Sequence, residues 1–289
     1  MSYQSIFAPD LFKDQVIVIT GGGSGIGRCT AHELAHLGAT VVIMGRTLEK
    51  LETVAEEIKQ DGGKADYVTL DIRDEEGVKA AIATVMERHG RIDALVNNAG
   101  GQFPSPIEKI SKNGFSTVVE NNLVGGFLMS KEVYNVTMKE NGGNIVNITA
   151  DCQNGFPNMV HTGAARAGME NFTKTAAWEW GRYGVRVNAV APGIVASSGL
   201  ETYDPQTKAH LLKTSEKIPV RRLCTEAEVS AGIVFLLSPA SAYTNGEVLR
   251  IDGGGQFGSS NLYLPLPRPE ENHNPTFDGF HRSHLKKGE

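Results

Sequence analysis

The chain has 289 residues, 40% of them hydrophobic and 21% charged, which suits one globular α/β domain. Its formal net charge of −5, without a lysine or arginine run, argues against a nucleic-acid partner. The cysteines are scattered, so we expect no bound metal. No uncharged apolar run reaches about 18 residues, so we expect no membrane contact. Without an N-terminal signal pattern, the sequence predicts a cytoplasmic protein.

Short apolar runs alternate along the chain with longer segments of helical period. In chain order, we expect strand 16–20, helix 25–37, strand 40–44, helix 48–60, strand 65–70, helix 75–89, strand 93–97, helix 111–138, strand 143–148, helix 164–183, strand 185–190, helix 226–237 and strand 247–251. The strands are continuously apolar, as in a parallel sheet covered on both faces. The pattern predicts a single-domain Rossmann fold with a doubly wound, seven-stranded sheet.

Two segments do not follow this alternation. Residues 197–217 are polar and follow Pro192-Gly193, so we expect a substrate-covering loop (194–220) with short helices inside domain 1–255. Residues 256–289 form a proline-rich C-terminal extension. Its apolar residues favour packing on the surface or on a neighbouring subunit over partial disorder; these residues are Tyr263, Leu264, Leu266, Phe277 and Phe280.

A glycine-rich turn joins the first strand to the first helix. A nucleotide pyrophosphate requires a tight turn, close approach of the backbone and free N–H groups at the start of a helix. The turn therefore predicts a dinucleotide site, and its residues are Gly21, Gly23, Ser24, Gly25, Ile26 and Gly27.

The end of the second strand indicates which dinucleotide is bound. An NAD site needs an acid there for the ribose 2′-hydroxyl, whereas this chain has Gly45-Arg46-Thr47. Arg46 supplies hydrogen-bond donors suited to a 2′-phosphate, with Ser24 and Thr47 as further donors. The sequence predicts NADP(H), the alternative being that Arg46 is a solvated residue at a helix start.

Four further motifs resemble those of the short-chain dehydrogenase/reductase family over about residues 12–255. They are Asp71-Ile72, Asn97-Asn98-Ala99-Gly100, the segment 122–127 and Ala191-Pro192-Gly193. The resemblance implies an adenine site at Asp71 and Ile72, and cofactor contacts from Asn98, Ala99, Gly100, Pro192, Gly193 and Val195. It also implies a homodimer or homotetramer, for which segments 111–138 and 164–183 offer apolar helix faces.

The carbonyl-reducing residues of that family are absent. The positions of its Tyr, Lys and Ser fall on Thr162, Arg166 and Ala150. A threonine hydroxyl cannot replace a phenol as the acid. Reduction of an enoyl thioester makes a different demand, because negative charge develops on the thioester oxygen and requires hydrogen-bond donors. Segments 154–168 and 218–222 resemble the branch of peroxisomal trans-2-enoyl-CoA reductases and 2,4-dienoyl-CoA reductases.

Five residues are the catalytic candidates: Asn122, Asp151, His161, Thr162 and Arg166. The resemblance implies that Arg166 holds the nicotinamide ribose and that Asn122 binds water or orients its helix. Thr162 is a donor for the thioester oxygen, and His161 is a donor or acid because it titrates near neutral pH. Asp151 begins a loop at the active-site edge, where it is either functional or a surface acid.

Three functions remain open on the sequence alone. The first is NADPH-dependent reduction of an acyl-CoA thioester in fatty-acid metabolism. The second is a carbonyl or alcohol oxidoreductase, such as a 3-ketoacyl type, that uses an atypical acid. The third is a non-catalytic NADP(H)-binding protein, which the cation at Arg166 disfavours because a decayed site would have no reason to keep it.

Overall fold

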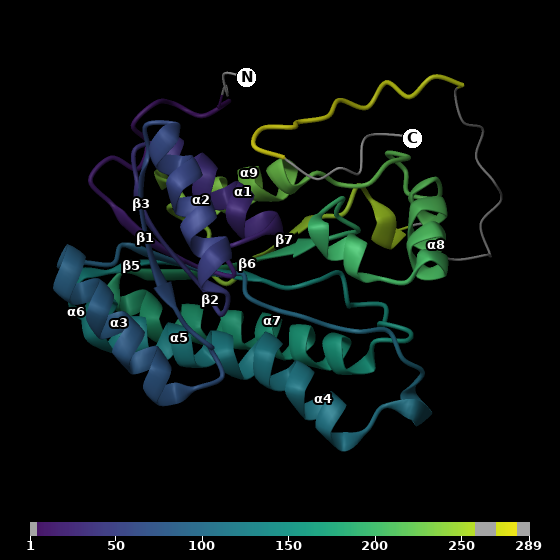
Figure 1. Ribbon diagram of the computed structural model, residues 1–289, viewed down its shortest axis with the longest axis horizontal. Helices are drawn as coiled ribbons and strands as arrows, with labels where there is room; N and C mark the ends of the chain where they lie inside the picture. The colour runs from purple at the N-terminus through teal and green to yellow at the C-terminus, as the bar shows by residue number, and fades with distance from the viewer. Residues whose placement is uncertain (1–4, 258–269, 282–289) are drawn as a thin grey trace.

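The computed structural model of the protein describes residues 5–257 and 270–281 (Figure 1). Seven parallel strands form one sheet in the order β3-β2-β1-β4-β5-β6-β7. The strands are β1 (Val16–Thr20), β2 (Thr40–Gly45), β3 (Lys64–Thr69), β4 (Ala94–Asn97), β5 (Gly143–Ile148), β6 (Val185–Pro192) and β7 (Val248–Ile251). The order reverses between β1 and β4, which is where ligands bind in open α/β sheets. The predicted fold class is confirmed.

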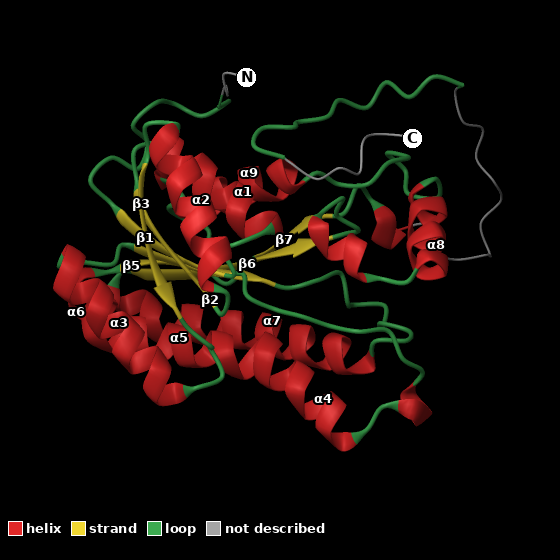
Figure 2. Cartoon of the chain, viewed as in Figure 1, coloured by secondary structure: helices red, strands yellow, loops and turns green. Residues whose placement is uncertain are grey.

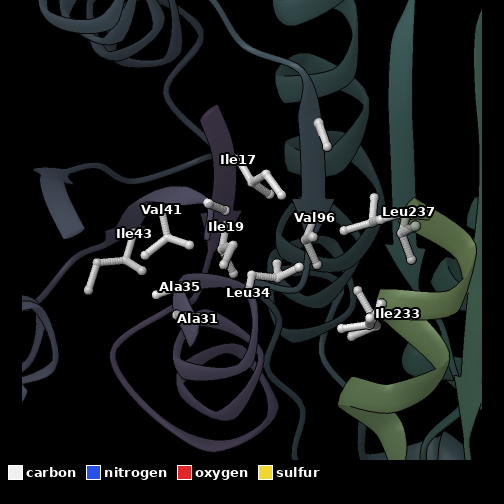
Figure 3. Packing of buried hydrophobic residues seen from close by; sticks show 14 of the residues in the cluster. Ile17, Ile19, Ala31, Leu34, Ala35, Val41, Ile43, Val96, Ile233 and Leu237 are labelled. Carbon is white, nitrogen blue, oxygen red and sulfur yellow. The ribbon is translucent and has the colours of Figure 1, made fainter. Parts of the chain in front are cut away.

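Helices cover both faces of this sheet (Figure 2). One face carries α1 (Gly25–His36), α2 (Leu48–Gln60) and α9 (Glu226–Leu237), and the other carries α3 (Glu75–His89), α4 (Lys112–Val119), α5 (Gly125–Val133) and α7 (Val160–Trp180). On the first face, Ile17 and Ile19 of β1 pack with Leu34 of α1 and Ile233 of α9 (Figure 3). The inner strands β1, β2, β4, β5 and β6 are mostly buried because both of their faces lie against helices, whereas the edge strands β3 and β7 are only partly buried.

The single predicted helix 111–138 is interrupted in the structure. Between α4 and α5 lies a π-helical turn, η2 (Glu120–Val124), and a second, η3 (Tyr134–Met138), precedes the short α6 (Lys139–Asn141). Within η2, the Asn122 side chain donates to the Val118 carbonyl at 2.8 Å. Such insertions are typical of functional sites, and they are invisible to periodicity because the hydrophobic pattern shifts by only one residue.

Helix α7 begins four residues before the predicted start at residue 164. His161 and Thr162 therefore lie in its first turn rather than in a loop. No side chain of the preceding residue caps this helix, but the His161 ring accepts the Thr162 N–H at 2.8 Å. That bond satisfies one of the free donors of the helix start, which extends the helix past the expected boundary.

The substrate loop contains the short helices that the sequence predicts. They are η5 (Ser198–Thr202) and α8 (Pro205–Ser215), the second capped by the Asp204 carboxylate. At the base of the loop, Ala196 N–H donates to the Cys224 carbonyl at 2.8 Å, and Cys224 N–H donates to the Ile194 carbonyl at 3.0 Å. The two ends of the loop are thus joined to each other beside β7.

Residues 270–281, here called the C-terminal strap, pack across the start of α9. Phe280 is buried against Cys29 and Ala227, with Phe277 alongside, so the predicted packing is confirmed for these two phenylalanines. Tyr263, Leu264 and Leu266 lie outside the described residues. Across residues 5–257 and 270–281, no helix has the length and apolar character needed to span a membrane.

Candidate functional site

The glycine-rich turn has the backbone geometry that a pyrophosphate requires. Gly21 and Gly25 have φ values of +67° and +58°, in the left-handed region that favours glycine. A side chain at Gly27 would collide with the Gly21 carbonyl and the Asn98 amide. Ser24 precedes α1 without capping it through its side chain, so its hydroxyl and the helix N–H groups remain available to an anion.

A cavity of about 190 Å³ runs from this turn to the end of β2. Eight residues predicted to bind the cofactor line it: Gly21, Gly23, Ser24, Arg46, Asp71, Ile72, Ala99 and Gly100. Thr47 and Lys50, at the start of α2, also contribute to the wall. The adenosine half of the predicted site is therefore one continuous hollow at the switch point of the sheet.

Arg46 is the cation at the outer end of this cavity. Within the described part of the chain it forms no hydrogen bond or ion pair. The nearby Asp71 is held instead by Arg73 at 2.6 Å, and this bond lowers the pKa of Asp71 to about 2. Lys50 adds a second positive group. An exposed guanidinium in the wall of this cavity, with no hydrogen bond or ion pair to a described residue, fits a 2′-phosphate.

Asn98 supports the turn from behind. Its side chain donates to the Thr20 and Gly21 carbonyls at 3.0 and 3.2 Å. In return, the Thr20 hydroxyl accepts the backbone N–H groups of Asn98 and Ala99, both at 3.0 Å. Asn98 does not line the cavity; it fixes the turn to the end of β4.

A buried polar network beneath the site was missed by the sequence reasoning. The Asn97 amide donates to Asn147 Oδ1 and Ser130 Oγ, both at 2.8 Å, and Asn147 donates to Thr173 Oγ1 at 2.9 Å. These side chains join β4, α5, β5 and α7, which between them present the candidate catalytic residues. The available signal was an asparagine near the carboxyl end of each of two strands, Asn97 in β4 and Asn147 in β5.

Arg166 reaches from α7 to the edge of the cavity. Its Nη1 donates to the Ile148 carbonyl at the end of β5. A methyl group at Gly100 would lie 2.6 Å from both Arg166 Nη2 and Asn122 Oδ1, so all three residues meet at one point. Burial lowers the pKa of Arg166 to about 10, and the group remains a cation at neutral pH. No ion pair with a described carboxylate compensates it.

Asn122 ties the π-helical turn to the loop after β4. Its amide donates to the Gly101 carbonyl at 2.6 Å, and its Oδ1 accepts the Gly101 N–H at 3.2 Å. With the bond to Val118, both amide hydrogens are engaged by backbone carbonyls. Of the two roles expected from the sequence, the geometry fits orientation of the helix and loop.

His161 and Thr162 are fully buried in the first turn of α7. Because His161 Nδ1 accepts a backbone N–H, the neutral ring carries its proton on Nε2. That N–H has no hydrogen-bond partner among the described residues. Burial lowers the pKa of the imidazole, and the Met159 backbone opposes this shift. The edge of the Phe103 ring lies against it, with 4.6 Å between centroids. At neutral pH His161 is thus a neutral donor rather than a charged acid.

Asp151 follows β5 and interacts electrostatically with residues at the end of β7. Burial raises the pKa of its carboxyl group, the Asp252 carboxylate adds to the rise, and Arg250 opposes it. Both Asp151 Oδ1 and Arg250 Nε are buried without a hydrogen-bond partner in the described part of the chain. The structure groups Asp151 with Arg250 of β7 and with Asp252, which follows β7, and neither was among the expected site residues.

The remaining predicted contacts lie along the ends of β6 and β7. Gly193 N–H donates to the Ile251 carbonyl at 2.9 Å, and Val195 pairs with Cys224 at the base of the substrate loop. Neither residue lines the adenosine cavity, and Pro192 ends β6 beside them. Ile26 packs on the core under the turn. This arrangement agrees with a cofactor extended across the sheet edge.

Two contacts that sequence reasoning missed link the loops around this edge. Gln102 Nε2 donates to the Tyr203 hydroxyl at 3.0 Å, joining the loop after β4 to the substrate loop. Ser105 N–H donates to the Asn158 carbonyl at 2.7 Å, joining it to the loop after β5. Three loops therefore enclose the region beside α7.

A doubly wound parallel sheet with this turn, cavity and cation defines a dinucleotide-dependent oxidoreductase. A family model described as enoyl-(acyl carrier protein) reductase matches residues 21–256. The chain belongs to the short-chain dehydrogenase/reductase family, and its cofactor is NADP(H).

Relatives within this family carry more specific names. A peroxisomal 2,4-dienoyl-CoA reductase from Danio rerio is 40% identical, covering 90% of this chain and 87% of the relative. A probable 2,4-dienoyl-CoA reductase from Bacillus subtilis is 38% identical, covering 84% and 96%. A solved structure, the citronellol catabolism dehydrogenase AtuB of Pseudomonas aeruginosa, is 55% identical, with a TM-score of 0.80 and coverage of 88% and 99%.

Proposed function

We propose that this protein is an NADPH-dependent reductase of 2-enoyl or 2,4-dienoyl thioesters of coenzyme A. The observation that carries the proposal is the first part of α7, which has Thr162 and Arg166 where a carbonyl reductase needs a phenol and a lysine. The site offers neutral donors and a fixed cation, which suit an oxyanion that forms without full proton transfer. The names of the 38–40% identical relatives support the same substrate class.

The residues divide the work as follows in this proposal. NADPH, when bound, supplies the hydride that reduces the carbon–carbon double bond. Arg166 holds the nicotinamide ribose hydroxyls, and Asn122 keeps helix α5 and the loop at Gly101 in place. The His161 Nε2–H and the Thr162 hydroxyl donate toward the thioester oxygen once Phe103 moves aside. Water protonates the α-carbon.

The Asp151 carboxyl group has a separate role in the proposal. Its raised pKa and unpaired oxygen make it a hydrogen-bonding group at the β7 side of the substrate. Pro192, Gly193 and Val195 bind the nicotinamide end of the cofactor, because they follow β6 at the same sheet edge as the cavity.

A second candidate function is oxidation of an alcohol, favoured by the name of the 55% identical structure. Such a reaction needs a base to take the hydroxyl proton. His161 is poorly suited, since its Nδ1 already accepts a backbone N–H and its Nε2 carries the proton. A non-catalytic role is disfavoured because the relatives named above are reductases and a dehydrogenase.

Absorbance of NADPH separates these functions. We expect oxidation of NADPH with crotonyl-CoA or a 2,4-hexadienoyl-CoA, and at most slow oxidation with acetoacetyl-CoA. Reduction of NADP⁺ by citronellol, with both thioesters inert, would favour the second candidate. Tight NADPH binding without turnover of any of these compounds would favour a non-catalytic role.

We also propose a cytoplasmic homodimer or homotetramer. Support for assembly comes from apolar side chains on α4, α5 and α7 that remain exposed: Phe115 is 37%, Phe127 41% and Trp178 88% accessible. Light scattering should give a mass two or four times that of the chain, and Trp178→Glu should reduce it. The free thiols of the three cysteines fit a reducing compartment, which fractionation of cells would test.

A further inference from the structure

The missing phenol has a candidate replacement outside α7. Five tyrosines fall in the described residues: Tyr67, Tyr134, Tyr183, Tyr203 and Tyr243. Tyr67 lies on β3 and donates to Glu52, and Tyr134 packs against Trp180 and Tyr183. Tyr243 is fully exposed before β7 begins. Of these five, Tyr203 is the one in a loop that leaves the carboxyl edge of the sheet.

The Tyr203 hydroxyl oxygen accepts a hydrogen bond, and its proton is not used in that bond. Because Gln102 Nε2 is the donor in their 3.0 Å bond, the phenol oxygen accepts and its own O–H can be given to another acceptor. No other hydrogen bond to Tyr203 Oη is formed within residues 5–257 and 270–281. A phenol with a fixed oxygen and an unused proton is suited to donate to a substrate.

The anchor of Tyr203 is the same short segment that contacts the candidate catalytic residues. Gly101 is bonded on both sides to Asn122, and Phe103 lies against the His161 ring. Gln102 stands between them. Residues 101–103 therefore connect Tyr203, from the loop after β6, with Asn122 from η2 and His161 from α7.

We propose that Tyr203 is a further catalytic residue whose hydroxyl donates a hydrogen bond to the thioester oxygen, with Gln102 as its positioning residue. This inference rests on the proposed function. As the hydride forms a C–H bond at the accepting carbon, the double-bond electrons shift toward the thioester oxygen, where the Tyr203 O–H stabilises the charge and keeps its proton. Water supplies the proton to carbon, and NADPH leaves as NADP⁺.

A different reading is that the Gln102–Tyr203 bond only latches the substrate loop shut. Tyr203→Phe and Gln102→Leu distinguish the two, since both break the latch but only the first removes the phenol proton. We expect Tyr203→Phe to lower kcat roughly 100-fold with KM changed less than about threefold, as for loss of one oxyanion donor. Gln102→Leu should lower kcat only about tenfold, because the phenol is retained but less well placed.

A spectroscopic readout tests the contact directly. A hydrogen bond to the thioester oxygen shifts the absorption of a bound 2,4-hexadienoyl-CoA to longer wavelength, measurable in the dead-end complex with NADP⁺. The shift should shrink in Tyr203→Phe and persist in Tyr243→Phe, a matched control at the opposite sheet edge. NADPH affinity should be unchanged in all variants.

The outcomes are distinct. Equal rises in KM for Tyr203→Phe and Gln102→Leu, with kcat and the absorption shift retained, would leave only a latch and overturn the proposal. If Tyr203→Phe turned over as fast as the wild type, the role of Tyr203 would be overturned while the proposed function would stand. Failure of the wild type to reduce any enoyl or dienoyl thioester would overturn the proposed function, and the role of Tyr203 with it.

Discussion

Replacement of Arg46 by alanine should convert the protein from an NADPH enzyme to one that scarcely distinguishes NADPH from NADH. Arg46 lines the 190 Å³ cavity and forms no hydrogen bond or ion pair with a described carboxylate, so its donors are available to a 2′-phosphate. Charge-assisted hydrogen bonds contribute about 1.5–3 kcal/mol, which corresponds to a loss of roughly 10- to 150-fold in NADPH affinity. NADH lacks the phosphate, and its affinity should change less than about twofold.

Titration of nucleotide fluorescence measures both dissociation constants on the same variant. Lys59→Ala, near the exposed end of α2 and away from the cavity, is a control for the loss of one positive charge. Lys50→Ala should have a smaller effect of the same sign, since Lys50 lines the cavity as a flexible point charge. An equal loss for NADPH and NADH would show that Arg46 acts on the fold, and retained NADPH affinity would refute its phosphate contact.

Three further results are expected from other parts of the molecule. Arg166→Ala should weaken NADPH binding by roughly 10-fold or more, with partial recovery in Arg166→Lys, and intact binding and turnover would contradict a ribose contact. Phe280→Ala should lower the free energy of unfolding by about 3 kcal/mol in urea titrations, because it empties the cluster with Cys29 and Ala227; an unchanged midpoint would show that the strap is not part of the cooperative fold. Burial raises the pKa of Glu33 to about 7, so the folded chain retains a proton that the unfolded chain loses near pH 4.5. Stability should therefore be full below pH 4.5 and fall by about 3 kcal/mol as the pH rises to 7, and Glu33→Gln should remove this dependence; an identical pH profile in the variant would assign it elsewhere.

Local sequence patterns were sufficient where burial alone determines structure. Apolar runs such as 16–20 and 40–44 became sheet strands because a parallel sheet excludes water from both faces. The glycine-rich turn could also be predicted from the sequence, since the left-handed φ values of Gly21 and Gly25 favour glycine. Arg46, Asp71 and their neighbours then fell into one cavity because they follow adjacent strands.

Features that depend on one particular hydrogen bond could not be predicted from local sequence patterns. The π-helical turn is accompanied by the Asn122 amide bonding to Val118 and Gly101, and the early start of α7 by a histidine ring that accepts its neighbour's N–H. The Gln102–Tyr203 bond joins residues 101 positions apart, and neither side chain belongs to a recognisable motif. Propensity and periodicity carry no information about such pairs.

The positive charge of Arg166 also affects how tightly the oxidised cofactor is bound after hydride transfer. The nicotinamide ring is neutral in NADPH and positively charged in NADP⁺, and in its proposed place at the ribose the Arg166 guanidinium would repel only the second. Because Arg166 is partly buried, added salt screens this repulsion less than it would a fully exposed charge. We therefore expect NADP⁺ to bind more weakly than NADPH, so that a high ratio of NADP⁺ to NADPH should inhibit turnover only weakly.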